Sequence, residues 1–114
     1  MHPGAFEFIS RHATNDSIKV IEVGSRDING SVRPLFPGAD YFGIDLFSGP
    51  GVDWVGDALD YEPTGVVDMV IIAEVLEHCP YWGELITHVW SWLKVGGKLI
   101  ITCAGPGRDF HSAI

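Results

Sequence analysis

Acidic side chains lie at or just after the ends of short apolar runs at several points of the sequence, and their spacing is typical of a nucleoside site. The run IKVIEV (residues 18–23) ends at Gly24, and the run YFGIDL (residues 41–46) contains Asp45. Asp45 lies 21 residues after Gly24, close to the separation of about 20 at which an acidic residue binds ribose hydroxyls. Asp57, in VGDALD, could accept a hydrogen bond from an adenine amino group. These residues indicate a small-molecule site.

The loop after Gly24 is rich in turn-forming residues but lacks the dinucleotide fingerprint G-x-G-x-x-G, because five residues separate Gly24 from Gly30. A glycine here lets the backbone approach a ligand, and Gly30 can adopt a positive φ. The alternative is an ordinary turn between a strand and a helix. Asp45 and Asp57 have similar alternatives, as a solvated strand-end carboxylate and as a turn or cap residue.

His78, in LEH, is the candidate for acid–base chemistry, since a neutral imidazole can remove a proton from an acceptor hydroxyl. A structural role is the alternative for this residue. No metal site is predicted, because no ligand-like spacing relates the remaining histidines and the two cysteines, which are His2, His12, His88, His111, Cys79 and Cys103.

Short strands and helical segments alternate along the chain and must position these residues. Apolar residues at helical spacing predict helices over residues 3–13 and 81–93, and a helical stretch beginning near Ser31. Apolar runs predict strands over residues 18–23, 41–46, 52–55, 66–73 and 98–103. Gly96 and Gly97 are predicted to end the second helix before the last strand. Residues 48–51 and 105–114 are predicted to be irregular loops.

This alternation predicts an α/β fold: a doubly wound three-layer sandwich around a mostly parallel sheet of about five strands. The chain of 114 residues is the size of one domain, so residues 1–114 are expected to form a single unit. In such sheets ligands bind at the carboxyl ends of the strands, near the point where the strand order reverses. The acidic residues are expected to gather there.

Five blocks together resemble the class I S-adenosylmethionine-dependent methyltransferases: VIEVGSRDING, GIDL, VGDALD, VDMVIIAEVLEH and LKVGGKLIIT. The resemblance runs from about residue 18 to residue 107, and the blocks containing AEVLEH and LKVGGKLIIT are its most specific parts. It implies a Rossmann-like fold with S-adenosylmethionine as the cofactor. It also implies methyl transfer to a small-molecule acceptor, with S-adenosylhomocysteine as the product.

The resemblance assigns roles to single residues. Glu22 would hold the methionine amino end through water, Asp45 would bind the ribose, and Asp57 would flank the adenine. Ala73 and Glu74 would close the methionine side. The full set of implied cofactor-binding residues is Glu22, Gly24, Ser25, Asp45, Leu46, Asp57, Ala58, Ala73 and Glu74.

The sequence also departs from the family. The first loop lacks the usual G-x-G, Val95 replaces a common proline, and the usual last two strands, which supply much of the substrate pocket, are missing. Two alternatives to a methyltransferase therefore stay open. One is a non-catalytic or truncated module of the same fold that binds the cofactor or a partner chain. The other is an NAD-binding Rossmann domain, favoured only by the spacing of Gly24 and Asp45.

Composition excludes several classes of partner. The 15 acidic and 7 basic residues give a formal net charge of −8, and the scattered basic residues argue against nucleic-acid binding. No apolar run approaches the length of about 18 residues that a membrane-spanning helix needs, and the N-terminus lacks a signal-peptide pattern. Cys79 and Cys103 are expected to be buried rather than disulfide-bonded. A cytoplasmic protein is predicted.

The tryptophans and the last strand suggest a homodimer. Trp82 lies on the apolar stripe of its predicted helix and is expected in the core, whereas Trp90 and Trp92 cannot share one face, so that one of them is expected to be exposed. The fifth strand would also be an unprotected edge of the sheet, and such edges tend to pair.

Overall fold

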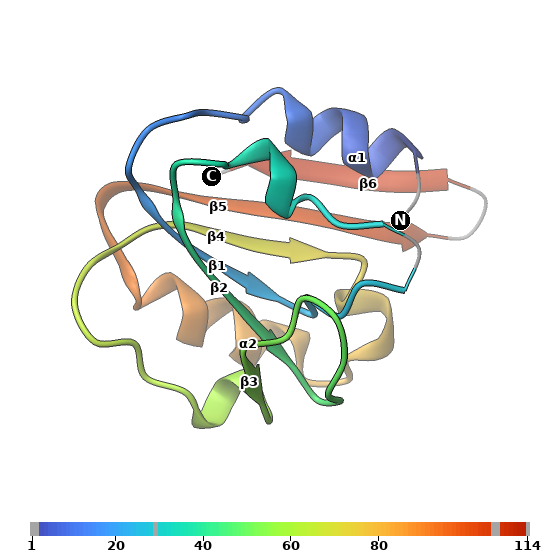
Figure 1. Ribbon diagram of the computed structural model, residues 1–114. Helices are drawn as coiled ribbons and strands as arrows, with labels where there is room; N and C mark the ends of the chain where they lie inside the picture. Colours follow the sequence, from blue (N-terminus) through green and yellow to red (C-terminus); the bar gives the residue numbers. More distant parts are fainter. Residues whose placement is uncertain (1–2, 29, 106–107, 114) are drawn as a thin grey trace.

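In the computed structural model of the chain, the described residues form six strands, two α-helices and three short 3-10 turns (Figure 1). The structure describes residues 3–28, 30–105 and 108–113. The strands are β1 (Lys19–Val23), β2 (Asp40–Asp45), β3 (Trp54–Val55), β4 (Val67–Ala73), β5 (Leu93–Gly105) and β6 (Arg108–Ala113). The helices are α1 (Pro3–Ser10) and α2 (Trp82–Trp90), and the 3-10 turns are η1 (Arg33–Leu35), η2 (Ala58–Asp60) and η3 (Leu76–His78).

The strands form one sheet in the order β3-β2-β1-β4-β5-β6. Strands β1 to β5 run parallel to one another, and β6 runs antiparallel to β5. The strand order reverses between β1 and β4, which are neighbours in the sheet although β2 and β3 come between them in the sequence. Met1 and His2, Asn29 of the first loop, and residues 106, 107 and 114 of the predicted tail lie outside the described residues.

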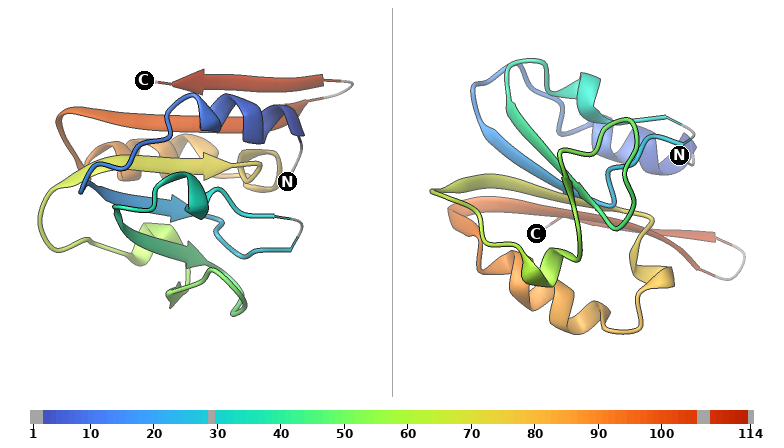
Figure 2. Two further views of the ribbon diagram at one scale, coloured as in Figure 1. Left: turned by 45° about the horizontal axis from the view of Figure 1, so that its top comes forward. Right: turned by 60° about the horizontal axis from the view of Figure 1, so that its bottom comes forward.

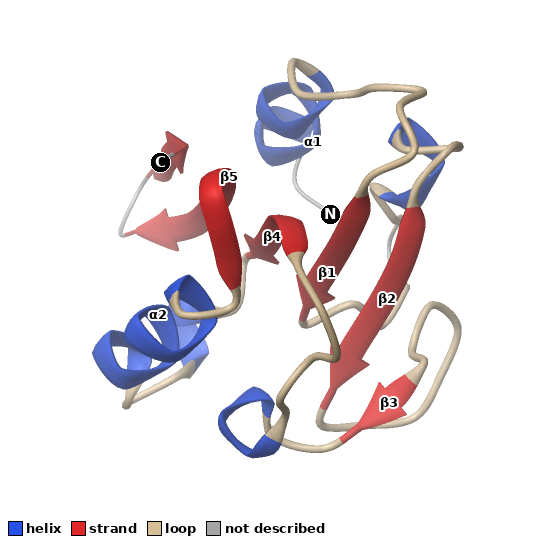
Figure 3. Ribbon diagram, turned by 90° about the vertical axis from the view of Figure 1, so that its left-hand side faces the viewer, coloured by secondary structure: helices blue, strands red, loops and turns tan. Residues whose placement is uncertain are grey.

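Helices cover both faces of the sheet, with α1 and η1 on one side and α2 and η2 on the other (Figures 2 and 3). Apolar strand residues alternate between these two sides, so that Val20 points toward the α1 side and Ile21 toward the α2 side. Burying each such side chain stabilises the fold by about 1.5–3 kcal/mol. The predicted doubly wound α/β sandwich with a mostly parallel sheet is confirmed. The cores include Ile9, Val20, Ile71 and Ile100 on the α1 side and Ile21, Leu85, Val89 and Leu99 on the α2 side.

The predicted helix near Ser31 is wrong. Only the single turn η1 forms there, since Pro34 has no backbone N–H and Pro37 disfavours a helical backbone at the preceding residue. Phe36, which precedes Pro37, has φ −128° and ψ 60° and so ends the turn. The segment still contributes to the core on the α1 side, where Val32 and Phe36 are buried.

The glycine pair 96–97 lies inside β5 instead of ending α2. The helix already ends at Trp90, β5 begins at Leu93, and the register of β4 with β5 shifts between Val67 and Met69. Gly96 has φ +83°, a conformation that glycine adopts without steric cost. The pair therefore permits an irregularity within a strand.

The C-terminal tail is not the irregular loop that the sequence predicts. Arg108–Ala113 pairs antiparallel with β5, in a register that runs from Ile100 opposite Ala113 to Gly105 opposite Arg108. The prediction that the fifth strand is an unprotected edge is therefore also wrong, because β6 accepts and donates the hydrogen bonds along that edge.

The predictions for the aromatic residues are partly wrong. Trp82 is 56% exposed rather than in the core, because Leu85 and Val89 form the buried face of α2. Trp90 is 48% exposed and Trp92 is 5% exposed, so one of this pair is on the surface as predicted. Cys79 and Cys103 form no disulfide within the described part of the chain and are half-buried rather than fully buried.

Candidate functional site

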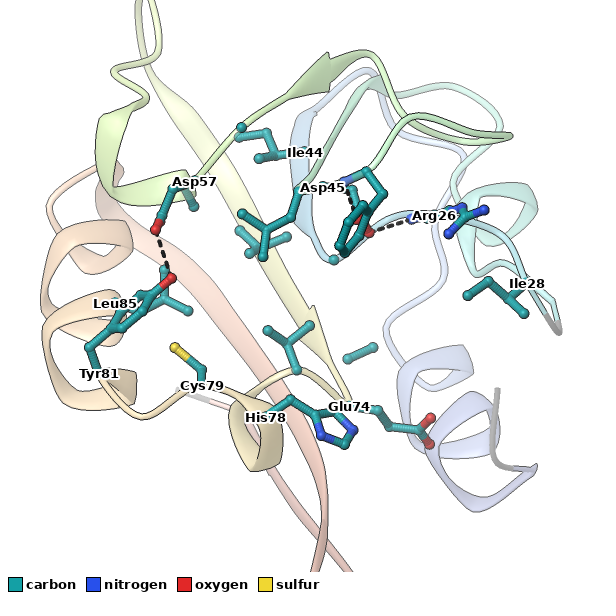
Figure 4. Close-up of a pocket in the computed structure, with 18 residues that line it drawn as sticks. Arg26, Ile28, Ile44, Asp45, Asp57, Glu74, His78, Cys79, Tyr81 and Leu85 are labelled. Atoms are coloured by element: carbon teal, nitrogen blue, oxygen red, sulfur yellow. Dashed lines mark hydrogen bonds between the residues drawn. The ribbon is translucent and has the colours of Figure 1, made fainter.

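A cavity of about 360 Å³ opens at the carboxyl ends of β1, β2 and β4, where the strand order reverses (Figure 4). This is the position at which open parallel sheets bind ligands, and the volume falls in the range of small-molecule pockets, about 300–1,000 Å³. Four loops, those that follow β1, β2, β3 and β4, contribute to its lining. The lining residues are Val23, Gly24, Arg26, Ile28, Ile44, Asp45, Leu46, Phe47, Gly56, Asp57, Ala58, Ala73, Glu74, Val75, His78, Cys79, Tyr81 and Leu85.

Most of the residues that the sequence singles out meet in this cavity. The residues in the lining are Gly24, Asp45, Leu46, Asp57, Ala58, Ala73, Glu74 and the candidate base His78. Glu22 and Ser25 are the two that the structure places outside the lining, and both are buried. Seven of the nine predicted cofactor residues therefore share one cavity, although they come from the ends of different strands and the segments that follow them.

Gly24 occupies a position that another residue would strain. Its φ is +79°, and a Cβ atom built on it would come within 2.2 Å of Val75 Cγ2. Its backbone N–H donates to the carbonyl of Ile44 at 2.8 Å, which ties the end of β1 to β2. The glycine therefore lets the loops after β1 and β4 pack closely at the floor of the cavity.

Asp45 organises the loops around the mouth of the cavity. One carboxylate oxygen accepts a hydrogen bond from the backbone N–H of Arg26 at 3.0 Å, and the other accepts one from the backbone N–H of Phe47 at 3.0 Å. A carboxylate has about four acceptor positions, so each oxygen can still accept a further hydrogen bond. Asp45 can thus hold two loops in place and accept hydrogen bonds from hydroxyl groups of a ligand.

Asp57 is the N-cap residue of η2, as its ordinary alternative predicts, but it also has a partner in Tyr81, which directly precedes α2. Its Oδ1 accepts from the backbone N–H of Leu59 at 2.9 Å, and its Oδ2 accepts from the hydroxyl of Tyr81 at 2.7 Å. The hydrogen bond to Asp57 raises the pKa of Tyr81 to about 12. The loop after β3 and the start of α2 are therefore joined in the wall of the cavity.

Glu22 lies behind the cavity, on the α1 side of the sheet. It is 3% exposed, and its Oε1 accepts a hydrogen bond from the hydroxyl of Tyr41 at 2.6 Å. Burial raises the pKa of this carboxyl to about 7, although the Tyr41 hydroxyl and the Arg33 guanidinium both oppose the shift. In this arrangement Glu22 supports the site from behind.

Ser25 is also buried, beside Gly43 of β2. Its Oγ has no hydrogen-bond partner, and a Cβ atom on Gly43 would come within 2.4 Å of it. Gly43 therefore makes room for Ser25 between the first two strands.

Glu74 and His78 lie together at the far end of the cavity from Asp57 (Figure 4). Among the described residues, Glu74 is the one non-glycine residue with a positive φ, which is 58°. Such strain is often found at functional sites. The backbone N–H of Glu74 donates to the carbonyl of Thr102 at 2.7 Å, which fixes this turn against β5.

Sequence reasoning missed several lining residues, including Arg26, Ile28, Phe47, Cys79 and Tyr81. Arg26 and Ile28 belong to the first loop, and Phe47 follows Asp45, so their positions beside predicted residues were a signal. Tyr81 had no such signal, because its link to Asp57 spans 24 residues. Among the described residues, no group of three His, Cys, Asp or Glu side chains is arranged to hold a metal ion.

Comparisons with known proteins agree on the fold. No protein-family model matches the sequence, and no curated protein matches it significantly. Phosphoethanolamine N-methyltransferase 2 from Haemonchus contortus, solved with S-adenosylmethionine, is similar with a TM-score of 0.72 and 23% identity, over 96% of this chain and 30% of that chain. The N-methyltransferase NodS from Bradyrhizobium japonicum has a TM-score of 0.69 and 17% identity, over 89% of this chain and 66% of that one.

A third similar structure has a different stated activity. Precorrin 8w decarboxylase from Methanobacterium thermoautotrophicum has a TM-score of 0.68 and 19% identity, over 92% of this chain and 64% of that one. The chain therefore has the Rossmann-like fold of class I methyltransferases, which confirms the predicted resemblance at the level of fold. It spans 30% of the length of the Haemonchus enzyme, and the fold alone does not assign a reaction.

No helix in the described part of the chain is long and apolar enough to cross a membrane.

Proposed function

We propose that this chain binds S-adenosylmethionine in the cavity and is the cofactor-binding part of a methyltransferase acting on a small-molecule acceptor. The observation that carries the proposal is the meeting of residues from four loops in one cavity. Seven of the nine residues that the sequence resemblance assigns to the cofactor line it. The similarity in fold to N-methyltransferases from Haemonchus contortus and Bradyrhizobium japonicum supports the same proposal.

The lining suits an adenosine carrying positive charge. Ile28, Leu46 and Phe47 line the cavity although they are 71%, 58% and 65% exposed, so a flat apolar ring could cover their surface. Among the described lining residues, the carboxylates of Asp45, Asp57 and Glu74 outnumber the guanidinium of Arg26. This field favours a sulfonium and an ammonium group over a phosphate. Asp45 would bind the ribose hydroxyls, and Glu74 would face the methionine end.

The same features argue against an NAD-binding domain. A pyrophosphate binds at the N-terminus of a helix that directly follows the first strand. In the described part of the chain the loop after β1 leads only to the turn η1, and no lysine lines the cavity. The spacing of Gly24 and Asp45 therefore supports a nucleoside site without supporting a dinucleotide.

The chemistry that the cofactor supplies when bound is an activated methyl group on a sulfonium. The protein must then hold the acceptor in line with that group, which is largely a matter of orientation. His78 lines the cavity beside Glu74 and would remove a proton from an acceptor hydroxyl or ammonium group. We therefore assign His78 as the candidate general base.

A non-catalytic cofactor-binding module is the second candidate. This candidate is favoured because the chain spans 30% of the length of the Haemonchus enzyme. A turnover assay with a panel of small-molecule acceptors separates the candidates, since methyl transfer by this chain contradicts the module.

The homodimer also remains a proposal, now supported by exposed Trp82 and Trp90 alone. Light scattering that gives only 12.5 kDa over a wide concentration range would contradict it.

Calorimetric titration tests the binding proposal directly. The chain is titrated with S-adenosylmethionine and S-adenosylhomocysteine, and with NADH and ATP as controls. Binding of the first pair alone is the expected result. A folded chain that binds neither of the pair, or that binds NADH more tightly, would overturn the proposal.

A further inference from the structure

Tyr81 and Asp57 form a hydrogen-bonded pair in the wall of the cavity, although they belong to different elements. Tyr81 directly precedes α2 and donates its hydroxyl to Asp57 Oδ2 at 2.7 Å. Both side chains line the cavity, on the side away from Arg26 and Ile28 (Figure 4). The pair therefore lies where one end of an elongated ligand would contact the protein.

Both members of the pair are anchored in the core. The backbone N–H of Leu85 donates to the carbonyl of Tyr81 at 3.0 Å, and Leu85 is buried between α2 and the sheet. Asp57 is held from the other side by the backbone N–H of Leu59 at 2.9 Å, next to buried Ala58. Two donors from two packed elements thus fix the orientation of the carboxylate.

These two donors also determine what the carboxylate can offer a ligand. Each oxygen of Asp57 already accepts one hydrogen bond and retains a further acceptor position. The phenol of Tyr81 is protonated at neutral pH even at the ordinary pKa of 10, and its bond to Asp57 raises the pKa to about 12, so it stays a donor. The wall therefore presents an oriented acceptor to the cavity.

We infer that Tyr81 is a positioning residue that makes the cavity selective for a purine with a 6-amino group. The inference rests on the proposed function, because it requires a nucleoside in this cavity. A 6-amino group can donate to the oriented carboxylate. A 6-oxo group presents an acceptor instead, which the carboxylate repels. Tyr81 contributes to the selectivity by holding Asp57 and need not contact the ring.

Binding of matched adenine and hypoxanthine compounds tests this role. The probes are S-adenosylhomocysteine and S-inosylhomocysteine, with adenosine and inosine beside them. The natural chain should prefer the adenine member by about tenfold or more, the effect of one hydrogen bond to a charged group. Tyr81→Phe should weaken binding of the adenine compounds by about three- to tenfold and leave binding of the hypoxanthine compounds unchanged. Tyr61→Phe removes a hydroxyl outside the cavity lining and should change neither.

The pattern across probes separates positioning from a general structural role. Equal losses for both purines in Tyr81→Phe, or no loss for either, would overturn the inference. Asp57→Asn provides a second test, because its amide can donate to a 6-oxo group and should shift the preference toward hypoxanthine. A natural chain that prefers adenosine but binds neither sulfur compound would overturn the proposed function alone. A natural chain that binds none of the probes would overturn both.

Discussion

The hydroxyl of Tyr41 donates a 2.6 Å hydrogen bond to the carboxylate of Glu22, and both side chains are buried on the α1 side of the sheet. Glu22 belongs to β1 and Tyr41 to β2, so the bond crosses two neighbouring parallel strands. Arg33 lies over the Tyr41 ring at 5.1 Å and donates to the Tyr41 carbonyl at 3.0 Å. A titratable group thus lies in the core directly behind the cavity.

Glu22 should make the protein more stable in mild acid than above neutral pH. Burial raises the pKa of its carboxyl from 4.5 to about 7. The folded state therefore binds this proton more tightly than the unfolded state. The stabilisation is fully present below about pH 4.5 and is lost as the pH rises through 7. The loss amounts to about 3 kcal/mol in the free energy of unfolding.

Urea denaturation from pH 5 to pH 8, about the range of the shift, checks this expectation in the natural chain and in Glu22→Gln. Glutamine cannot titrate, so the difference between the two chains isolates the contribution of this carboxyl. Tyr41→Phe removes a donor that lowers the pKa of Glu22 and should move the loss to higher pH. Parallel pH profiles for the natural chain and Glu22→Gln would show that Glu22 does not carry the effect.

Asp45→Ala should weaken binding of S-adenosylmethionine by about 1.5–3 kcal/mol, the range for hydrogen bonds to a charged group. The substitution also removes the acceptor for the backbone N–H groups of Arg26 and Phe47. Calorimetry measures the affinity, and circular dichroism checks the fold. Asp16→Ala, which changes an exposed carboxylate outside the lining, is the matched control. Unchanged affinity in a folded Asp45→Ala chain would place the ribose elsewhere.

Gly24→Ala should destabilise the fold by about 3 kcal/mol or more, because it combines a left-handed backbone with a clash in a packed site. The new Cβ would come within 2.2 Å of Val75 Cγ2. Gly65 has a similar φ of +88° but has no atom within 4 Å of a built Cβ. Gly65→Ala should therefore cost only the backbone term of about 1–2 kcal/mol. Thermal unfolding of the two variants compares the terms, and equal losses would contradict the role of the contact with Val75.

His78→Gln should lower the rate of methyl transfer by about a hundredfold or more if His78 is the general base. Cofactor affinity should change little, since the resemblance places the cofactor on other residues. His88→Gln is the control, because His88 contacts Tyr61 and Glu62 outside the cavity lining. A rate that does not depend on His78 would show that alignment of the reactants alone supports the reaction.

Much of the fold could be predicted from the sequence because its signals are local. The β-branched run containing Val20 and Ile21 can bury both faces of a strand only in a covered sheet, which indicates a parallel α/β fold. The same locality holds for the candidate site. Gly24, Asp57 and Glu74 each come after a predicted strand, Asp45 lies near the end of one, and the carboxyl ends of parallel strands meet at one edge of the sheet.

The tertiary structure decided everything that depends on a distant partner. The pairing of β6 with β5, the hydrogen bond from Tyr81 to Asp57, and the orientation of Glu22 toward Tyr41 all join residues that no local pattern relates. The exposure of Trp82 likewise depends on which face of α2 the sheet accepts. Periodicity shows that a segment has a buried face, but only packing against the other elements selects the side chains that are buried and the groups that they contact.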